Sequence, residues 1–258
     1  MLALTPVKVD AAHVREVIAR SIERHGGERW SRIERLTLRP RSLSGLVPWS
    51  KGHGRTFQLP SYAEIEPQSA RATFFDYPRA GERGVFDAGR LALGDAPLAE
   101  HRGTFRGVAK LRRWRPLDAL YFFGYALTHY HAMPWTLRDA EPLALRRTGR
   151  RAGRGDGHST RSDDGGFALT VRFPASLHTH CPVQTVYFAA DGLILRHDYV
   201  ADIVGSLARG AHYWRDYVTV DGIAIATRRI VYARLFRQPL PIVALDAQFE
   251  PPRVTFVE

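Results

Sequence analysis

The sequence predicts an α+β fold in which a curved antiparallel β-sheet, a half-barrel, is closed by two or more helices. Short β-rich runs between turn residues fill most of the chain, and Asp191-Gly192 and Asp221-Gly222 join the longest of them. Only two segments have a clear helical pattern. Because 45% of the 258 residues are hydrophobic, the chain can bury a large core, and we expect a single domain covering residues 1–258.

The first helix is expected directly after Asp10, whose carboxylate can accept hydrogen bonds from the free N–H groups at a helix start. An apolar stripe at helical spacing follows, made of Val14, Val17, Ile18 and Ile22. Gly26-Gly27 ends the helix, because glycine accepts the left-handed conformation of a C-terminal cap.

Short strands are expected next. Leu36, Leu38, Leu43 and Leu46 carry an imperfect alternation. The clearer runs lie between turn residues and cover 56–59, 62–66, 71–77, 84–86 and 90–93.

A second, buried helix is expected over residues 116–127. Pro116 suits the first turn, where its missing N–H is not needed, and Asp118 complements the positive end of the helix dipole. Gly124 in the middle of this helix costs about 1 kcal/mol relative to alanine, which indicates that another group approaches closely there. We expect the helix to form one wall of an apolar cavity whose opposite wall is the sheet formed by the last third of the chain.

Residues 146–166 are rich in Gly, Arg, Ser and Asp and cannot bury apolar area, so we expect a mobile loop. The same segment could equally be the long tip of a hairpin, because β-rich residues flank it at 143–145 and 167–173.

Residues 183–235 are expected to form a continuous antiparallel meander with its tight turns at the two Asp-Gly pairs. In its second strand the alternation places Leu193, Leu195, His197 and Tyr199 on one face. That face is apolar apart from His197, whose ring needs a partner such as a ligand or a trapped water.

This order of elements resembles the open half-barrel of the bacterial lipoprotein carriers, the LolA/LppX-like group. The resemblance rests on HGGERW after the first helix, RGVFDAGRLAL in the early strands, and DGLILRHDY and VDGIAIATRRIVYARL in the meander. It implies a curved antiparallel sheet, closed by helices, that holds acyl chains in an apolar cavity. It implies no catalytic residues.

The net charge of +11 comes almost entirely from arginine. It is compatible with an anionic partner, and equally with a genome that encodes arginine in place of lysine. No known nucleic-acid-binding motif is present, so we expect no nucleic-acid partner. The first twenty residues do not resemble an export signal, no apolar run is long enough to span a membrane, and Cys181 is the single cysteine. We therefore expect a cytoplasmic protein.

Two His-x-His pairs are candidate metal ligands. His129 and His131 lie at the end of the second helix, where residues two apart diverge by about 200°. His178 and His180 lie in an extended stretch and can point the same way, with His197 or His212 as a third ligand. The alternatives are hydrogen-bonding histidines at the edge of a cavity and acid–base catalysis. We expect no cofactor and no fully occupied metal site.

The leading functional hypothesis is a cytoplasmic binding protein for a hydrophobic small molecule, which could be anionic. The candidate ligand-binding residues are mostly aromatic and comprise Tyr121, Gly124, Tyr125, Trp135, Leu195, His197, Tyr199 and Tyr213. Two alternatives remain open. One is a cyclase or isomerase that uses His129, His131 or His197 on a hydrophobic substrate, and the other is a metal-dependent enzyme built on His178 and His180.

Overall fold

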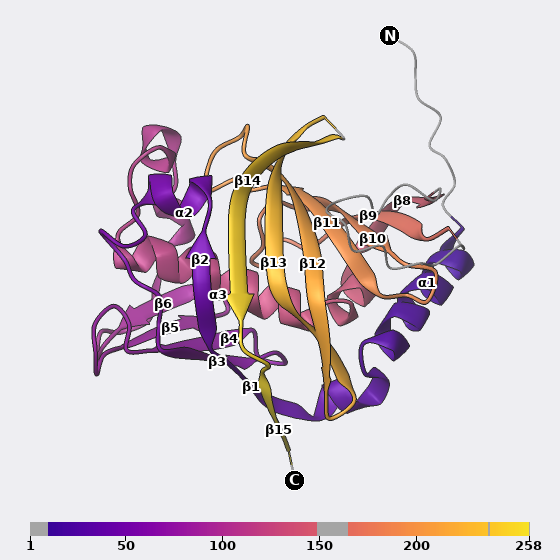
Figure 1. The fold of residues 1–258 in the computed structure, drawn as a ribbon, viewed down its shortest axis with the longest axis horizontal. Helices are drawn as coiled ribbons and strands as arrows, with labels where there is room; N and C mark the ends of the chain where they lie inside the picture. Colours follow the sequence, from indigo (N-terminus) through magenta and orange to yellow (C-terminus); the bar gives the residue numbers. More distant parts are fainter. Residues whose placement is uncertain (1–9, 149–164, 237, 258) are drawn as a thin grey trace.

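The computed structural model describes residues 10–148, 165–236 and 238–257 (Figure 1). It confirms the α+β half-barrel: two antiparallel sheets and a few helices surround the central helix α3. The described α-helices all lie before residue 133 and are α1 Ala11–Arg24, α2 Leu46–Lys51 and α3 Pro116–Ala132. Short 3₁₀ turns accompany them at Gly27–Arg32, Arg102–Thr104, Gly107–Lys110 and Trp135–Asp139.

The first sheet has seven strands in the order β15-β1-β3-β4-β5-β6-β7. Its strands are β1 Ile33–Leu38, β3 Tyr62–Glu66, β4 Arg71–Phe75, β5 Arg83–Asp87, β6 Arg90–Leu93, β7 Ala99–Glu100 and β15 Arg253–Phe256. Four of the expected early strands are therefore present. Residues 56–59 are the exception: they form a loop after α2 with one isolated bridge between Phe57 and His53.

The second sheet has eight strands in the order β2-β14-β13-β12-β11-β10-β9-β8. Its strands are β2 Pro40–Ser44, β8 Glu141–Arg147, β9 Phe167–Arg172, β10 Val183–Phe188, β11 Ile194–Val200, β12 Arg209–Val220, β13 Ile223–Leu235 and β14 Gln238–Phe249. The meander over 183–235 is confirmed, with turns at both Asp-Gly pairs. The hairpin alternative is also confirmed, because β8 pairs with β9; most of the loop expected over 146–166 lies outside the described residues.

The two sheets adjoin at one corner. The chain leaves β1 in the first sheet, passes Arg39 and enters β2 in the second, and it returns from β14 to β15 over residues 250–252. These strands are neighbours at the adjoining ends of the two sheets, so the sheets form one curved surface. Helix α3 runs behind β12–β14 in Figure 1, inside that surface, and α1 lies near the opposite edge of the second sheet.

The helix starts are as expected. Asp10 Oδ1 accepts a hydrogen bond from the backbone N–H of Ala12 at 2.9 Å, and Asp118 Oδ2 accepts one from the backbone N–H of Arg115 at 2.8 Å. These carboxylates satisfy N–H groups that the helices themselves cannot pair.

Gly124 does not face the meander, which corrects one expectation. A Cβ at this position would lie 2.5 Å from the Phe86 side chain on β5, so the glycine lets α3 approach the first sheet. The close approach inferred from the sequence is present, but a phenylalanine ring of the protein makes it rather than a ligand.

Candidate functional site

The inner face of the second sheet carries histidine in the middle of an apolar row. The strand registers place Val186 opposite His197, His197 opposite His212, and His212 opposite Val231. Directly opposed side chains lie close enough to interact. The row ends on both sides in buried or half-buried aliphatic residues, so these two imidazoles lie far from water.

Helix α3 covers this face with aromatic and polar side chains. The Tyr125 hydroxyl bonds Nδ1 of His180 at 2.8 Å, and the Tyr130 hydroxyl bonds Nε2 of the same ring. The ring of His180 stacks on Tyr199 with 3.9 Å between centroids. Both nitrogens of His180 are therefore paired, and the ring is locked between the helix and β11.

His197 is also held, by a protein group rather than by a ligand. Its Nε2–H donates to Oε1 of Gln184, while the Gln184 amide nitrogen donates to Thr179 Oγ1 at 2.7 Å and to the Cys181 carbonyl at 2.6 Å. This fixes the amide and the imidazole in one orientation. Nδ1 of His197 keeps no partner in the described structure.

Burial keeps these histidines neutral at neutral pH. Desolvation lowers the pKa of His129 to about 4 and that of His131 to about 3. It also holds the pKa values of His180, His197 and His212 well below their usual range. A charged imidazole in this interior would lose its hydration without gaining a carboxylate.

Arg229 is the cation of this interior. It lies on the inner face of β13, 5% exposed, and its guanidinium carbon is 3.7 Å from the ring centre of Trp214. No ion pair or hydrogen bond joins Arg229 to any residue that the structure describes, and its Nη1 is buried without an acceptor. Desolvation lowers its pKa to about 10, so it remains charged at neutral pH.

A pocket of about 20 Å³ lies against Arg229. Trp30 and Trp135 stack at 4.2 Å between centroids on one side of it, and Trp214 lines it from β12. The indole N–H of Trp214 has no acceptor within the described ranges. The pocket is therefore aromatic, carries one positive charge and offers unpaired hydrogen-bond donors.

A second, apolar pocket of about 50 Å³ lies beside the corner where the sheets adjoin. Phe123 and Leu127 of α3 form one wall, and Leu43 and Ala247 of β2 and β14 form another. Nearly all of its surface is carbon. This pocket corresponds to the expected apolar cavity, but its wall in the second sheet comes from β2 and β14 rather than from the meander.

The two pockets adjoin. Ala247 of the apolar pocket is directly opposite Arg229 of the aromatic pocket on the neighbouring strand. The same cross-strand row continues from Ala247 to Leu43 on one side and from Arg229 to Trp214 on the other. Opposed side chains on one face lie roughly 5 Å apart, so the row leads directly from an apolar surface to a cation.

His178 and His180 point the same way, and each bonds a tyrosine of α3. The Tyr121 hydroxyl meets Nδ1 of His178 at 2.9 Å, one helical turn before Tyr125 meets His180. The pair therefore holds the 174–182 segment onto the helix. Within the described ranges, no three His, Cys, Asp or Glu side chains are grouped to hold a metal ion.

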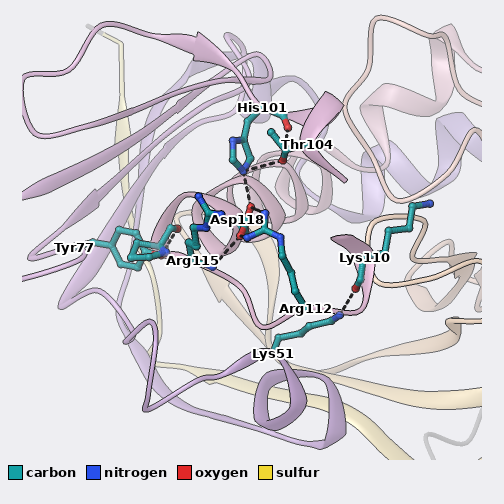
Figure 2. A network of polar contacts seen from close by, with 9 residues as sticks. Lys51, Tyr77, His101, Thr104, Lys110, Arg112, Arg115 and Asp118 are labelled. Carbon is teal, nitrogen blue, oxygen red and sulfur yellow. Dashed lines mark hydrogen bonds and ion pairs between the residues drawn. The ribbon is translucent and has the colours of Figure 1, made fainter. Parts of the chain in front are cut away.

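A second polar network surrounds the start of α3 (Figure 2). His101 Nε2 bonds Asp118 Oδ1 at 2.8 Å, and Arg112 bonds the same carboxylate at 3.0 Å. Thr104 Oγ1 is 3.4 Å from that same nitrogen of His101. A catalytic triad needs the carboxylate and the hydroxyl on opposite ring nitrogens, so this network caps the helix and does not activate a nucleophile.

The structure brings together some of the predicted site residues. Tyr125, His197 and Tyr199 lie in the buried cluster, with His129 beside His197 at 6.0 Å between ring centroids. Trp135 and His131 line the pocket of Arg229. Consistent with their helical spacing, His129 and His131 do not share a site.

Two predicted residues of the meander lie elsewhere. A β-bulge between β10 and β11 pairs Phe188 with Ile194, so Ile194 rather than Leu195 shares the buried face with His197. Tyr213 is on the outer face of β12, where it contacts Arg196 and Tyr232. Leu195 was assigned to the buried face from alternation without knowing the register, and Tyr213 was chosen as an aromatic residue of the meander without any assignment of its face.

Sequence reasoning missed Arg229 and Gln184 as parts of the site, and it placed Tyr130 in the aromatic cluster of the second helix but not among the candidate ligand-binding residues. Arg229 is one of two consecutive arginines, and the register distinguishes the buried one from Arg228 on the outer face. The available signal was alternation: Arg229 and Val231 share a face, and an arginine beside an apolar neighbour in a central strand is unusual.

These features define the class: an α+β half-barrel with an apolar pocket and an adjoining buried cation. The fold is LolA-like. It is similar to the crystal structure of a LolA superfamily protein from Nitrosomonas europaea, with a TM-score of 0.51 and 9% identity over 99% of this chain and 96% of that one. A DUF1329 family protein from Desulfovibrio piger gives a TM-score of 0.44 at 10% identity over 93% of this chain and 92% of that one. No family model and no curated protein matches the sequence.

Proposed function

We propose that this protein binds a hydrophobic small molecule in the apolar pocket between its two sheets. The observation that carries the proposal is the pocket lined by Leu43, Phe123, Leu127 and Ala247, which is apolar on all these sides. Removing apolar surface from water contributes about 25 cal/mol per Å², so such a lining favours a hydrocarbon group.

The half-barrel supports the same proposal. The lipoprotein-carrier group, which the sequence resembles, holds acyl chains between a curved sheet and its helices. A space of about 50 Å³ accommodates only a short run of methylene groups. A longer chain therefore requires the lining side chains to move apart, or the rest of the ligand to extend outside the pocket.

No described helix has both the length and the hydrophobicity that a membrane span requires.

Titration with N-phenyl-naphthylamine, an uncharged probe that fluoresces in apolar surroundings, tests the proposal. Wild type is expected to bind it, and Leu127→Trp to bind it at least about tenfold more weakly, because the indole fills the pocket. Leu117→Trp is the matched control, since Leu117 is also a half-buried leucine of α3 but does not line the pocket. Equal binding by both variants, with both still folded, would contradict the assignment of the pocket.

A further inference from the structure

We infer that the ligand is an amphipathic monoanion, a carboxylic acid on an apolar tail, and that Arg229 binds its carboxylate. This inference rests on the proposed function and assigns the chemical class of the ligand. The tail occupies the apolar pocket and the head occupies the aromatic pocket beside it.

Arg229 is a buried charge without an ionic partner among the described residues. An arginine in a protein interior normally has a carboxylate partner, because taking its charge out of water is costly. Arg229 is 5% exposed and has no such partner among the residues that the structure describes. Stacking on Trp214 and Tyr130 offsets part of that cost, but it satisfies none of the N–H donors.

The pocket of Arg229 has hydrogen-bond donors that lack acceptors. Both Arg229 and Trp214 line the small pocket, and both carry buried N–H groups without acceptors. Arginine and tryptophan side chains donate and do not accept. The missing partner is therefore a group rich in acceptors, and a carboxylate offers two oxygens in the planar geometry that a guanidinium binds best.

The charge of the pocket indicates the charge of its ligand. His25 and His131 also line this pocket, and burial lowers their pKa values to about 4 and about 3. Both rings are neutral at pH 7, so Arg229 contributes the pocket's single positive charge. A monoanion balances it, whereas a dianionic phosphate would leave a negative charge in an apolar interior.

The two pockets lie side by side, so one linear ligand can reach both. Ala247 and Arg229 are opposed across two paired strands, so the apolar pocket begins where the cation ends. Leu36 and Leu38 on β1, two residues apart, line the aromatic and the apolar pocket respectively. A linear molecule can therefore place its head at Arg229 and its chain against Ala247 and Leu38.

Displacement of N-phenyl-naphthylamine by decanoic acid, decanol and decyl phosphate at pH 7.5 tests this inference. Wild type is expected to bind decanoic acid about tenfold or more tightly than decanol, in line with a charge-assisted hydrogen bond. Arg229→Met should lose that preference and keep its affinity for decanol. Arg228→Met is the matched control, because Arg228 lies on the outer face in an ion pair with Asp246, and it should behave as wild type.

The outcomes separate the two proposals. If wild type binds neither the acid nor the alcohol, the proposed function is wrong. If wild type binds both equally, or Arg229→Met keeps the preference for the acid, the apolar pocket stands and the role of Arg229 is wrong. Tighter binding of decyl phosphate than of decanoic acid would contradict the inference that the ligand is a monoanion. The comparison of ligands on wild type decides the question even if Arg229→Met fails to fold.

Discussion

Helix α3 meets the two sheets in different ways. Toward the first sheet the contact is a fit of shapes: the helix has a glycine where Phe86 approaches, and Leu120 packs over Gly84. Toward the second sheet the contact is a set of hydrogen bonds and rings, in which Tyr125 and Tyr130 hold His180. The first interface is a close-packed apolar contact, and the second buries hydrogen-bonded polar groups.

The difference shows what each interface is sensitive to. A close-packed apolar contact fails when atoms are added, because neither backbone can move away cheaply. A buried polar contact fails when a proton is added or a hydrogen-bond partner is removed. Perturbations that affect one interface should therefore leave the other largely unchanged.

The largest expected effect is acid destabilisation of the second interface. The pKa of His129 is about 4 in the folded protein and near 6.5 in the unfolded chain, so the unfolded chain binds the extra proton between these values. Stability is therefore fully present above pH 6.5 and falls as the pH drops toward 4, by roughly 3 kcal/mol for this histidine alone. With several such histidines buried together, we expect the folded state to be lost near pH 5, as measured by urea unfolding monitored by circular dichroism.

His129→Leu sharpens this test. Neither ring nitrogen of His129 has a well-formed hydrogen bond to a described residue, although the Gln184 side chain lies near enough to act on its pKa, so its replacement removes mainly a titrating group. The variant should show a visibly shallower loss of stability between pH 6.5 and 5. An unchanged pH dependence would mean that His129 is accessible to protons in the folded protein.

The next effect concerns the first interface. Gly124→Leu should destabilise the protein by about 3 kcal/mol, because the added side chain meets Phe86 and the backbone of α3 is already close to β5. In an exposed helix the same change would stabilise by nearly 1 kcal/mol, so the sign is diagnostic. Combining it with Phe86→Ala should cost less than the sum of the two single changes in urea unfolding, and simple additivity would show that the two residues are not in contact.

The smallest effect compares two hydroxyls on one helix. Tyr125→Phe should cost about 1–2 kcal/mol, because it leaves Nδ1 of fully buried His180 unpaired. Tyr121→Phe should cost less than about 0.5 kcal/mol, because His178 is half-buried and water can replace the hydroxyl. Equal losses in thermal or urea unfolding would indicate that the 174–182 segment shields both histidines alike.

The sequence predicted more of the fold than of the candidate site. Turn chemistry and strand composition predicted the meander, and Asp10, Pro116 and Asp118 predicted two helix starts, because these signals are local. Which side chains meet inside depends on register, and one bulge moved Leu195 out of the buried face. Gly124 showed the limit most clearly: its cost signalled a close neighbour, but no local pattern identified that neighbour as Phe86, 38 positions earlier in the sequence.

The corner where the two sheets adjoin has a mechanical consequence. Both direct strand-to-strand connections between the sheets, at Arg39 and at residues 250–252, lie on this one line, and the other two connections between them run through α2 and through α3. A rotation of one sheet relative to the other about this line would break none of the described strand pairs, because no such pair joins the two sheets. The apolar pocket lies beside this line, so a small rotation would widen it only slightly. The displacement would be larger at the edge of the second sheet far from this line, where the 174–182 segment is hydrogen-bonded to α3.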